Sequence, residues 1–223
     1  MKKEISKTIL RAIKNAFNNF QKNFARGLST DQLFCFFKSS LDNELGEYQI
    51  VYDYIWGKDS VNIDGITSGY IPQDGDTVIM DISVCYKGYW CDVCRTYFVG
   101  AFTKEQKECF ELIKKSISAG EKLLRVNQEV KDIFGAVNQV YKNAGLSLVH
   151  HAGHKIADKP ISKPQFLEEE AGVIEDDNLY AIESGLYNGF GIRLENDYYI
   201  ENDLTENLFI DLMPLEISEY LLK

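Results

Sequence analysis

The chain has 223 residues, of which 45% are hydrophobic, a content that is ordinary for a folded globular protein and argues against disorder. It carries 24 lysine and arginine residues against 34 aspartate and glutamate residues, a formal net charge of −10. A surface of this sign repels phosphate backbones and anionic headgroups, so we expect no nucleic-acid or membrane partner.

Cysteine usage and the N-terminal segment indicate the compartment. The five cysteines are an odd number scattered through apolar segments, which favours reduced thiols over a disulfide framework. Cys91 and Cys94 form a CxxC pair, but on a strand they would face opposite ways, so we assign them no metal or redox role. The segment MKKEISKTIL lacks a signal-peptide core, and no apolar run approaches membrane-spanning length. We therefore expect a cytoplasmic protein.

The first half of the chain predicts two helices followed by strands. Apolar residues recur with a helical period over residues 4–25, and Gly27 ends this helix. The segment Ser29-Thr30-Asp31 offers caps for a second helix that extends to about Leu41. Aromatic and β-branched residues predict strands, with a loop over 57–75 and a turn at Lys87-Gly88 between the last two: 48–56, 77–86 and 94–100.

The second half repeats this order. Thr103, with Gln106 nearby, is expected to cap a helix that runs to about Leu124. A further helix is predicted from about 128 to 143, before Gly145. Strands are then expected near four segments: 148–153, 178–187, 190–200 and 206–211. The repeated order of elements predicts one α+β domain over residues 1–223 with two similar halves.

The residues that could bind a metal or take part in catalysis are three histidines and four carboxylates. All three histidines of the chain lie within residues 150–154. The carboxylates each interrupt an apolar strand, where an unpaired charge is costly to bury: Asp81, Asp92, Glu183 and Glu195. A surface histidine cluster and half-exposed strand carboxylates are the ordinary alternatives. Together, however, these residues favour a shared cation site, because carboxylates that converge without a cation repel one another.

Four segments resemble, in order, the motifs of the creatinase/methionine aminopeptidase/Xaa-Pro peptidase superfamily, whose catalytic domain has the pita-bread fold. GDTVIMDISVCYKGYWCDVCRTYFVG (75–100) resembles its first metal-binding hairpin, and HHAGHKI (150–156) its histidine-rich segment. AIESGLY (181–187) resembles its IEPGIY string, and GIRLENDYYI (191–200) its GVRIED strand. The resemblance extends from about residue 4 to 215. It implies two pseudo-symmetric helix-helix-sheet halves around a central curved antiparallel sheet, without the additional N-terminal domain of creatinase-type members.

The resemblance also implies a set of site residues. Asp81 would bind one of two divalent ions, while Asp92 and Glu195 would bridge both. His154 and Glu183 would complete the coordination of the second ion. The ions would be manganese, cobalt, iron or zinc. Glu183 could also accept a proton during hydrolysis. His150 matches a histidine that contacts substrate in proline-specific members. Arg95 and Thr96 match closing residues of the hairpin motif and would support the site, whereas His151 has no counterpart and is expected at the surface or as a gating residue.

Two departures from the family pattern concern catalysis. A histidine that active members carry before the first metal-binding strand is replaced by Ile63 or Asp64. The position of a second family histidine is occupied by Ile161. Because general acid–base help contributes about 10²–10⁴-fold in rate, activity could be reduced or lost.

Three functions follow from the resemblance. The leading one is a metal-dependent aminopeptidase or dipeptidase, with Xaa-Pro bonds as a candidate target, short peptides as substrates and a homodimer as an open question. The alternative is a catalytically silent domain that binds peptides or a protein partner. A third, C–N hydrolysis of a small non-peptide molecule as in creatinase, is disfavoured by the intact ligand set.

Overall fold

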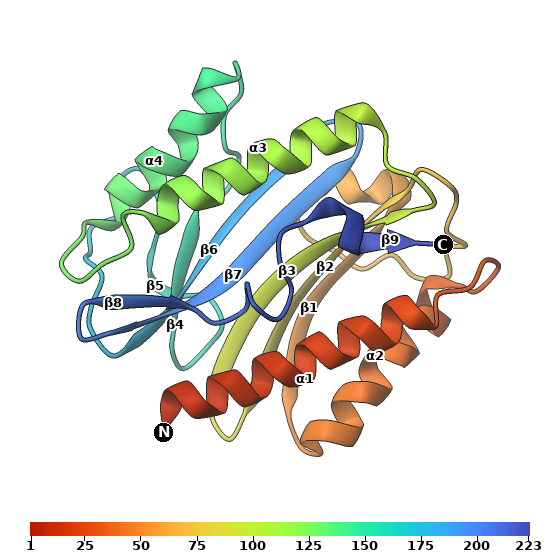
Figure 1. Cartoon of the computed structure of the whole chain (residues 1–223), viewed down its shortest axis with the longest axis horizontal. Coiled ribbons are helices and arrows are strands. Elements are labelled where there is room, and N and C mark those ends of the chain that lie inside the picture. The colour runs from red at the N-terminus through yellow and green to blue at the C-terminus, as the bar shows by residue number, and fades with distance from the viewer.

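Four helices cover one face of a curved, mostly antiparallel sheet in the computed structural model, which describes all residues from 1 to 223 (Figure 1). The helices are α1 (Lys2–Lys22), α2 (Thr30–Leu45), α3 (Lys104–Glu121) and α4 (Val130–Asn143). Helices α1 and α2 lie over one half of the sheet, and α3 and α4 lie over the other half. The predicted α+β class and the two similar halves are confirmed.

Local sequence explains where the helices begin and what they bury. In α1 the apolar stripe that includes Ile9, Ile13 and Phe17 is fully buried against the sheet and α2. Ser29 begins α2 with a capping box, because its side chain accepts from the backbone of Gln32 while the Gln32 side chain accepts from the Ser29 backbone. Thr103 and Gln106 form the same box at α3.

The strands form one nine-stranded sheet. They are β1 (Gln49–Trp56), β2 (Thr77–Tyr86), β3 (Tyr89–Val99), β4 (Gly153–Ile156), β5 (Ser162–Gln165), β6 (Asn178–Tyr187), β7 (Gly191–Glu201), β8 (Leu204–Asn207) and β9 (Leu221–Leu222). The order is β1-β2-β3-β7-β6-β4-β5, with β8 beside β7 and β9 beside β3. Two short 3-10 helices, Gly57–Val61 and Ile217–Tyr220, complete the chain. The central β3–β7 pair joins the two halves.

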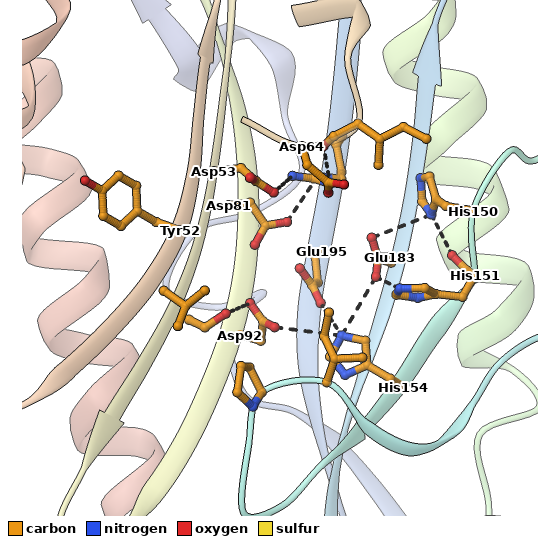
Figure 2. A pocket seen from close by; sticks show the side chains of 16 residues that line it. Tyr52, Asp53, Asp64, Asp81, Asp92, His150, His151, His154, Glu183 and Glu195 are labelled. Carbon is orange, nitrogen blue, oxygen red and sulfur yellow. Dashed lines mark hydrogen bonds and ion pairs between the residues drawn. The ribbon is translucent and has the colours of Figure 1, made fainter. Parts of the chain in front are cut away.

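Alternation along the strands separates a packed face from an open face. On β2, Val78, Met80 and Ile82 belong to the main hydrophobic core under the helices, whereas Asp81 lies between them and points the other way. On β7 the even-numbered residues from Ile192 to Ile200 other than Asn196 pack in that same core. Odd-numbered residues such as Glu195 therefore reach the face that the helices leave open (Figure 2).

Three predicted strand bounds are wrong. Strand β3 begins at Tyr89 rather than 94, because Lys87 and Gly88 form a tight turn with positive φ that lets pairing start at once. Residues 148–152 are not a strand, since the backbone NH of Leu148 bonds to a side chain of α4. The segment 206–211 pairs only to residue 207, where the Asn207 side chain accepts from two following backbone NH groups and turns the chain.

The two cysteines of the CxxC pair lie on β3. Cys91 is buried near the Ser6 carbonyl of α1, whereas Cys94 packs on the opposite face with Ile55 and Ile79, as predicted. All five cysteines are free thiols. None of the helices combines the length and apolar character needed to cross a bilayer.

Candidate metal centre

Strand register brings the four candidate carboxylates to one place on the open face. Asp81 on β2 is paired with Cys94 on β3, and Asp92 precedes Cys94 by two residues and so shares its face. Cys94 is in turn paired with Glu195 on β7, and Glu195 lies directly opposite Glu183 on β6. Asp81 is partly buried and the other three carboxylates are buried. These strands alone therefore make a cluster of acidic side chains (Figure 2).

His154 enters this cluster from β4. The preceding residue, Gly153, has φ +143°, and a Cβ there would lie 2.1 Å from the carbonyl oxygen of Ala181 on β6. Only glycine therefore allows β4 to approach β6 this closely. His154 Nε2 lies 3.3 Å from Glu195 Oε1, 3.8 Å from Asp92 Oδ2 and 3.8 Å from Glu183 Oε1.

The arrangement around His154 Nε2 fits a divalent cation. His154 Nδ1 lies 3.3 Å from the Lys155 carbonyl and donates to it, which leaves the lone pair of Nε2 facing carboxylate oxygens. Glu195 Oε1 is buried and receives no hydrogen bond. Two ligand atoms on one ion, each bonded at about 2.1 Å, lie about 3.0 to 3.4 Å apart. The 3.3 Å between His154 Nε2 and Glu195 Oε1 lies within this range, and the 3.8 Å spacings to Asp92 and Glu183 are slightly wider.

The pKa values show the same mismatch between burial and charge. Burial lowers the pKa of His154 to about 4, so its imidazole is neutral at pH 7, as a ligand requires. Burial, and then the neighbouring Asp81, raises the pKa of Asp92 well above its ordinary value. Burial, and then Asp92, does the same for Glu195. A bound cation would hold both carboxyls in the charged form.

Asp81 is held by Arg193, which was not among the predicted site residues. Arg193 Nε lies 3.1 Å from Asp81 Oδ2, and another guanidinium nitrogen donates to Asp53 Oδ2 at 2.9 Å. A third nitrogen donates to the Ile63 carbonyl at 3.0 Å. Burial raises the pKa of Asp81 to about 6 even though Arg193 lowers it. Arg193 precedes Glu195 by two residues on an apolar strand, which was the available signal for a shared face.

Glu183 is contacted by two further histidines. His151 Nδ1 lies 2.9 Å from Glu183 Oε1, and His150 Nδ1 lies 3.7 Å from Glu183 Oε2. Burial alone would raise the pKa of Glu183, but His151 and the other imidazoles hold it well below its ordinary value. Of the two roles expected for His151, the surface position is wrong, because its side chain is only 20% exposed and the loop before β4 folds inward over Glu183, whereas the gating role stays a prediction.

All of these side chains line one pocket, which encloses about 140 Å³. Asp64 and Ile161 also line it, so the two positions at which the family pattern has histidines do lie at the site. Ile161 is 42% exposed at the pocket wall. The three imidazoles at the site all come from the one histidine cluster.

Arg95 has a supporting position. It is fully buried and donates to the backbone carbonyl of Glu195 at 2.6 Å and to Asn196 Oδ1 at 2.7 Å. Thr96 exchanges hydrogen bonds with the backbone of Arg193. Both residues therefore fix the part of β7 that carries Arg193 and Glu195.

Sequence comparison identifies relatives among peptidases. The chain is 26% identical over 198 residues to an uncharacterized peptidase of Methanocaldococcus jannaschii, covering 79% of this chain and 56% of that protein. It is 24% identical over 180 residues to the Xaa-Pro aminopeptidase of Escherichia coli, covering 66% of this chain and 41% of that protein. The chain therefore spans about half the length of these curated relatives, or less.

Solved structures share the fold. The prolidase from Pyrococcus furiosus matches with a TM-score of 0.87 at 18% identity, over 93% of this chain and 63% of that one. The Xaa-Pro dipeptidase from Bacillus anthracis matches with a TM-score of 0.87 at 20% identity, over 93% of this chain and 60% of that one. The predicted pita-bread fold is confirmed. The profile of metallopeptidase family M24 matches residues 4–202, which is most of the sequence, and the chain therefore belongs to that family.

Proposed function

We propose that the chain is a dinuclear metal-dependent aminopeptidase or dipeptidase that acts on short peptides, with Xaa-Pro bonds as its first candidate target. The observation that supports this most is the convergence of four carboxylates and a neutral imidazole on one pocket. Relatives named as Xaa-Pro aminopeptidase and Xaa-Pro dipeptidase support the substrate class.

Five side chains would hold the two ions: Asp81, Asp92, His154, Glu183 and Glu195. When bound, such ions lower the pKa of water and stabilise the oxyanion that forms as a peptide carbonyl is attacked. The strands fix the five side chains before substrate arrives, so little reorganisation is needed.

Other residues of the pocket have roles in proton transfer and orientation. Glu183 is charged at neutral pH, because its pKa is held low, and can accept a proton from the attacking water. His150 faces Tyr187, with 3.4 Å between His150 Nε2 and the Tyr187 hydroxyl, and lies on the wall where it can contact substrate. Arg193 restrains the Asp81 carboxylate.

The acidic lining suits one end of a peptide better than the other. Asp53 and Asp64 line the pocket beside Asp81, and Arg193 is the one guanidinium among them. Two bound divalent ions would balance the four ligand carboxylates, so Asp53, Asp64 and Arg193 leave one net negative charge, which favours the α-ammonium group of a peptide over its α-carboxylate. The charge distribution therefore supports an aminopeptidase-type orientation.

The test is hydrolysis by the purified chain supplied with Mn²⁺ or Co²⁺. A panel of Xaa-Pro dipeptides, Xaa-Pro-Xaa tripeptides and peptides without proline is incubated with wild type and with Glu183→Gln. Metal-stimulated release of an N-terminal residue by wild type, abolished by chelator and by the substitution, supports the proposal. Ion binding without any release of amino acids contradicts it.

A second candidate is a peptide- or protein-binding domain without catalysis. It is favoured by one observation, the presence of Asp64 and Ile161 where the family pattern has histidines. The same panel distinguishes the two, since a silent binding domain would bind peptides in the presence of metal and leave them intact.

A further inference from the structure

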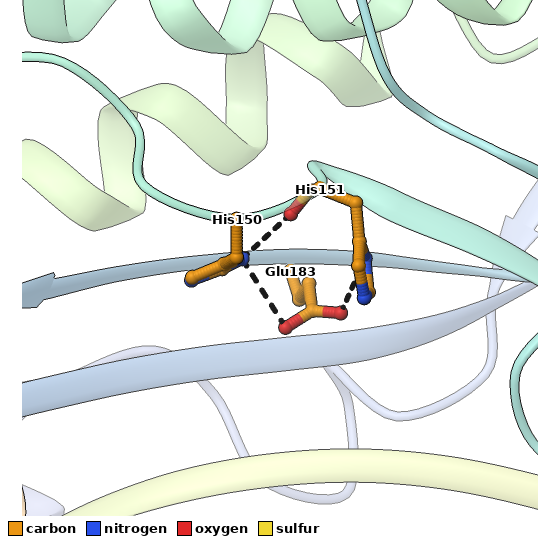
Figure 3. A group of neighbouring side chains, drawn as sticks. All are labelled: His150, His151 and Glu183. Atoms are coloured by element: carbon orange, nitrogen blue, oxygen red, sulfur yellow. Dashed lines mark hydrogen bonds and ion pairs between the residues drawn. The ribbon is translucent and has the colours of Figure 1, made fainter. Parts of the chain in front are cut away.

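His151 is the histidine that the family motifs do not explain. It lies in the loop between α4 and β4, and its side chain is folded against Glu183 rather than toward solvent (Figure 3). His150, His151 and Glu183 place one potential ligand atom each within 4.8 Å of one another. This group is separate from the group formed by Asp92, His154 and Glu195.

The hydrogen bonds decide which of the two histidines has a free ring nitrogen toward Glu183. His150 Nδ1 lies 2.6 Å from the carbonyl oxygen of His151, which can only accept, so this nitrogen carries a proton. The same nitrogen is the His150 atom that faces Glu183, at 3.7 Å. His150 is therefore prevented from ligating an ion through the side that faces the carboxylate.

His151 Nδ1 faces the carboxylate itself, so an ion bound between the two groups would replace the proton that they share. His151 Nδ1 lies 2.9 Å from Glu183 Oε1, and that oxygen also lies 3.8 Å from His154 Nε2. Glu183 Oε1 therefore lies near one imidazole nitrogen of each of two histidines, His151 and His154. The His151 contact is close to the spacing of about 3.0 Å expected for two ligands at right angles on one ion.

We propose that His151 is an additional metal ligand in this chain, which contacts together with Glu183 the second ion that His154, Asp92 and Glu195 also hold. The proposal rests on the proposed dinuclear centre and adds a residue to it. Imidazole ligands suit zinc, whereas carboxylate ligands suit manganese, so a second imidazole beside the three carboxylates changes the balance of the ligand set. His151 therefore shifts the preference of the second ion site toward Zn²⁺ and Co²⁺ and away from Mn²⁺.

The experiment compares His151→Leu with His150→Leu, a matched change at the neighbouring histidine of the same loop. Affinities of the full chain for Zn²⁺ and Mn²⁺ are measured by competition with a chromophoric chelator, and visible absorption is recorded with Co²⁺. Loss of an imidazole ligand in His151→Leu should lower Zn²⁺ affinity by about tenfold or more, with a change in the Co²⁺ spectrum. Mn²⁺ affinity should change by less than about threefold, and His150→Leu should leave both affinities within that range.

His151→Gln separates ligation from simple hydrogen bonding to Glu183. The glutamine amide can still donate to the carboxylate but supplies no imidazole, so Zn²⁺ affinity should remain low. Recovery of wild-type Zn²⁺ affinity by His151→Gln, equal Zn²⁺ affinities of wild type and His151→Leu, or equal losses in both leucine variants would overturn the role of His151. Circular dichroism and urea unfolding of the metal-free proteins show that the variants fold.

The outcomes also distinguish this proposal from the one on which it rests. If the wild-type chain binds no ion, the proposed dinuclear centre itself is wrong. If the wild-type chain binds two ions and His151→Leu leaves the ion preference unchanged, only the proposed ligand role of His151 is wrong.

Discussion

Glu183 and Glu195 lie directly opposite each other on β6 and β7, and His154 Nε2 is 3.8 Å from an oxygen of the first and 3.3 Å from an oxygen of the second. Like charges at paired positions of an antiparallel sheet destabilise it. The fold therefore bears an electrostatic cost at this point, which bound cations would offset.

This cost predicts that Glu195→Gln stabilises the metal-free protein. Burial raises the pKa of Glu195, so the folded chain binds that proton more tightly than the unfolded chain, in which the carboxyl titrates near pH 4. Its contribution is favourable at low pH and is lost as pH rises toward the folded pKa. Urea unfolding in chelator should show the variant more stable by about 1 kcal/mol at pH 8, with a smaller difference at pH 5.

The same variant should lose affinity for added metal, because an amide cannot replace a bridging carboxylate. A Glu195→Gln protein that is less stable than wild type in chelator at pH 8 would contradict the proposed repulsion. Wild-type metal affinity in the variant would contradict the proposed ligand role.

Arg193 should matter most when no metal is present. Removing it as Arg193→Met leaves Asp81 and Asp53 without their shared partner, and breaking a buried ion pair in this way costs about 3–5 kcal/mol. Added Mn²⁺ should reduce the loss, because cations would then neutralise Asp81. Urea unfolding of wild type and variant, each with chelator and with Mn²⁺, measures the difference. An equal loss of stability in chelator and in Mn²⁺ would show that the effect of Arg193 does not depend on the metal site.

Gly153 should not tolerate a side chain. In Gly153→Ala the Cβ would meet the Ala181 carbonyl at 2.1 Å and the backbone would be strained at φ +143°, so β4 must move away from β6. We expect a loss of more than about 2 kcal/mol in stability together with weaker metal binding. Gly135→Ala in α4, where a Cβ meets nothing within 4 Å, is the control and should be neutral or stabilising. Similar stabilities of the two variants would contradict this view of β4.

Much of the site could be predicted from sequence because its carboxylates lie on strands. The two-residue period of a strand places Asp81 and Asp92 on one face once the turn at Lys87-Gly88 is recognised. The side-chain network of Arg193 could not be predicted in this way. Its contact with Asp53 depends on the pairing of β1 with β2, which places Asp53 opposite Asp81, and local sequence carries no signal for that register.

The orientation of His151 was missed for a related reason. The residues before β4 form a loop, which has no periodicity from which the direction of a side chain can be inferred. The loop is fixed by tertiary contacts, such as the hydrogen bond from the Ala152 NH to the Phe166 carbonyl. The folded structure is therefore needed to distinguish an inward His151 from a surface one.

Restoring a histidine at Ile161 should increase peptide hydrolysis. Ile161 lines the pocket at a position where the family pattern has an imidazole, and an added general acid–base group contributes about 10²–10⁴-fold when well placed. We expect Ile161→His to raise kcat/KM by about tenfold or more, since its placement will not be ideal. Ile161→Gln is the control for polarity at this position. Equal rates in wild type and both variants would argue that chemistry at the site does not use this position.

The most direct test of the dinuclear centre is anomalous diffraction from crystals grown or soaked with Mn²⁺. We predict two peaks in the pocket, both contacted by Asp92 and Glu195, with Asp81 on one ion and His154 and Glu183 on the other. An empty pocket at saturating metal, or ions bound away from these five side chains, would contradict the account.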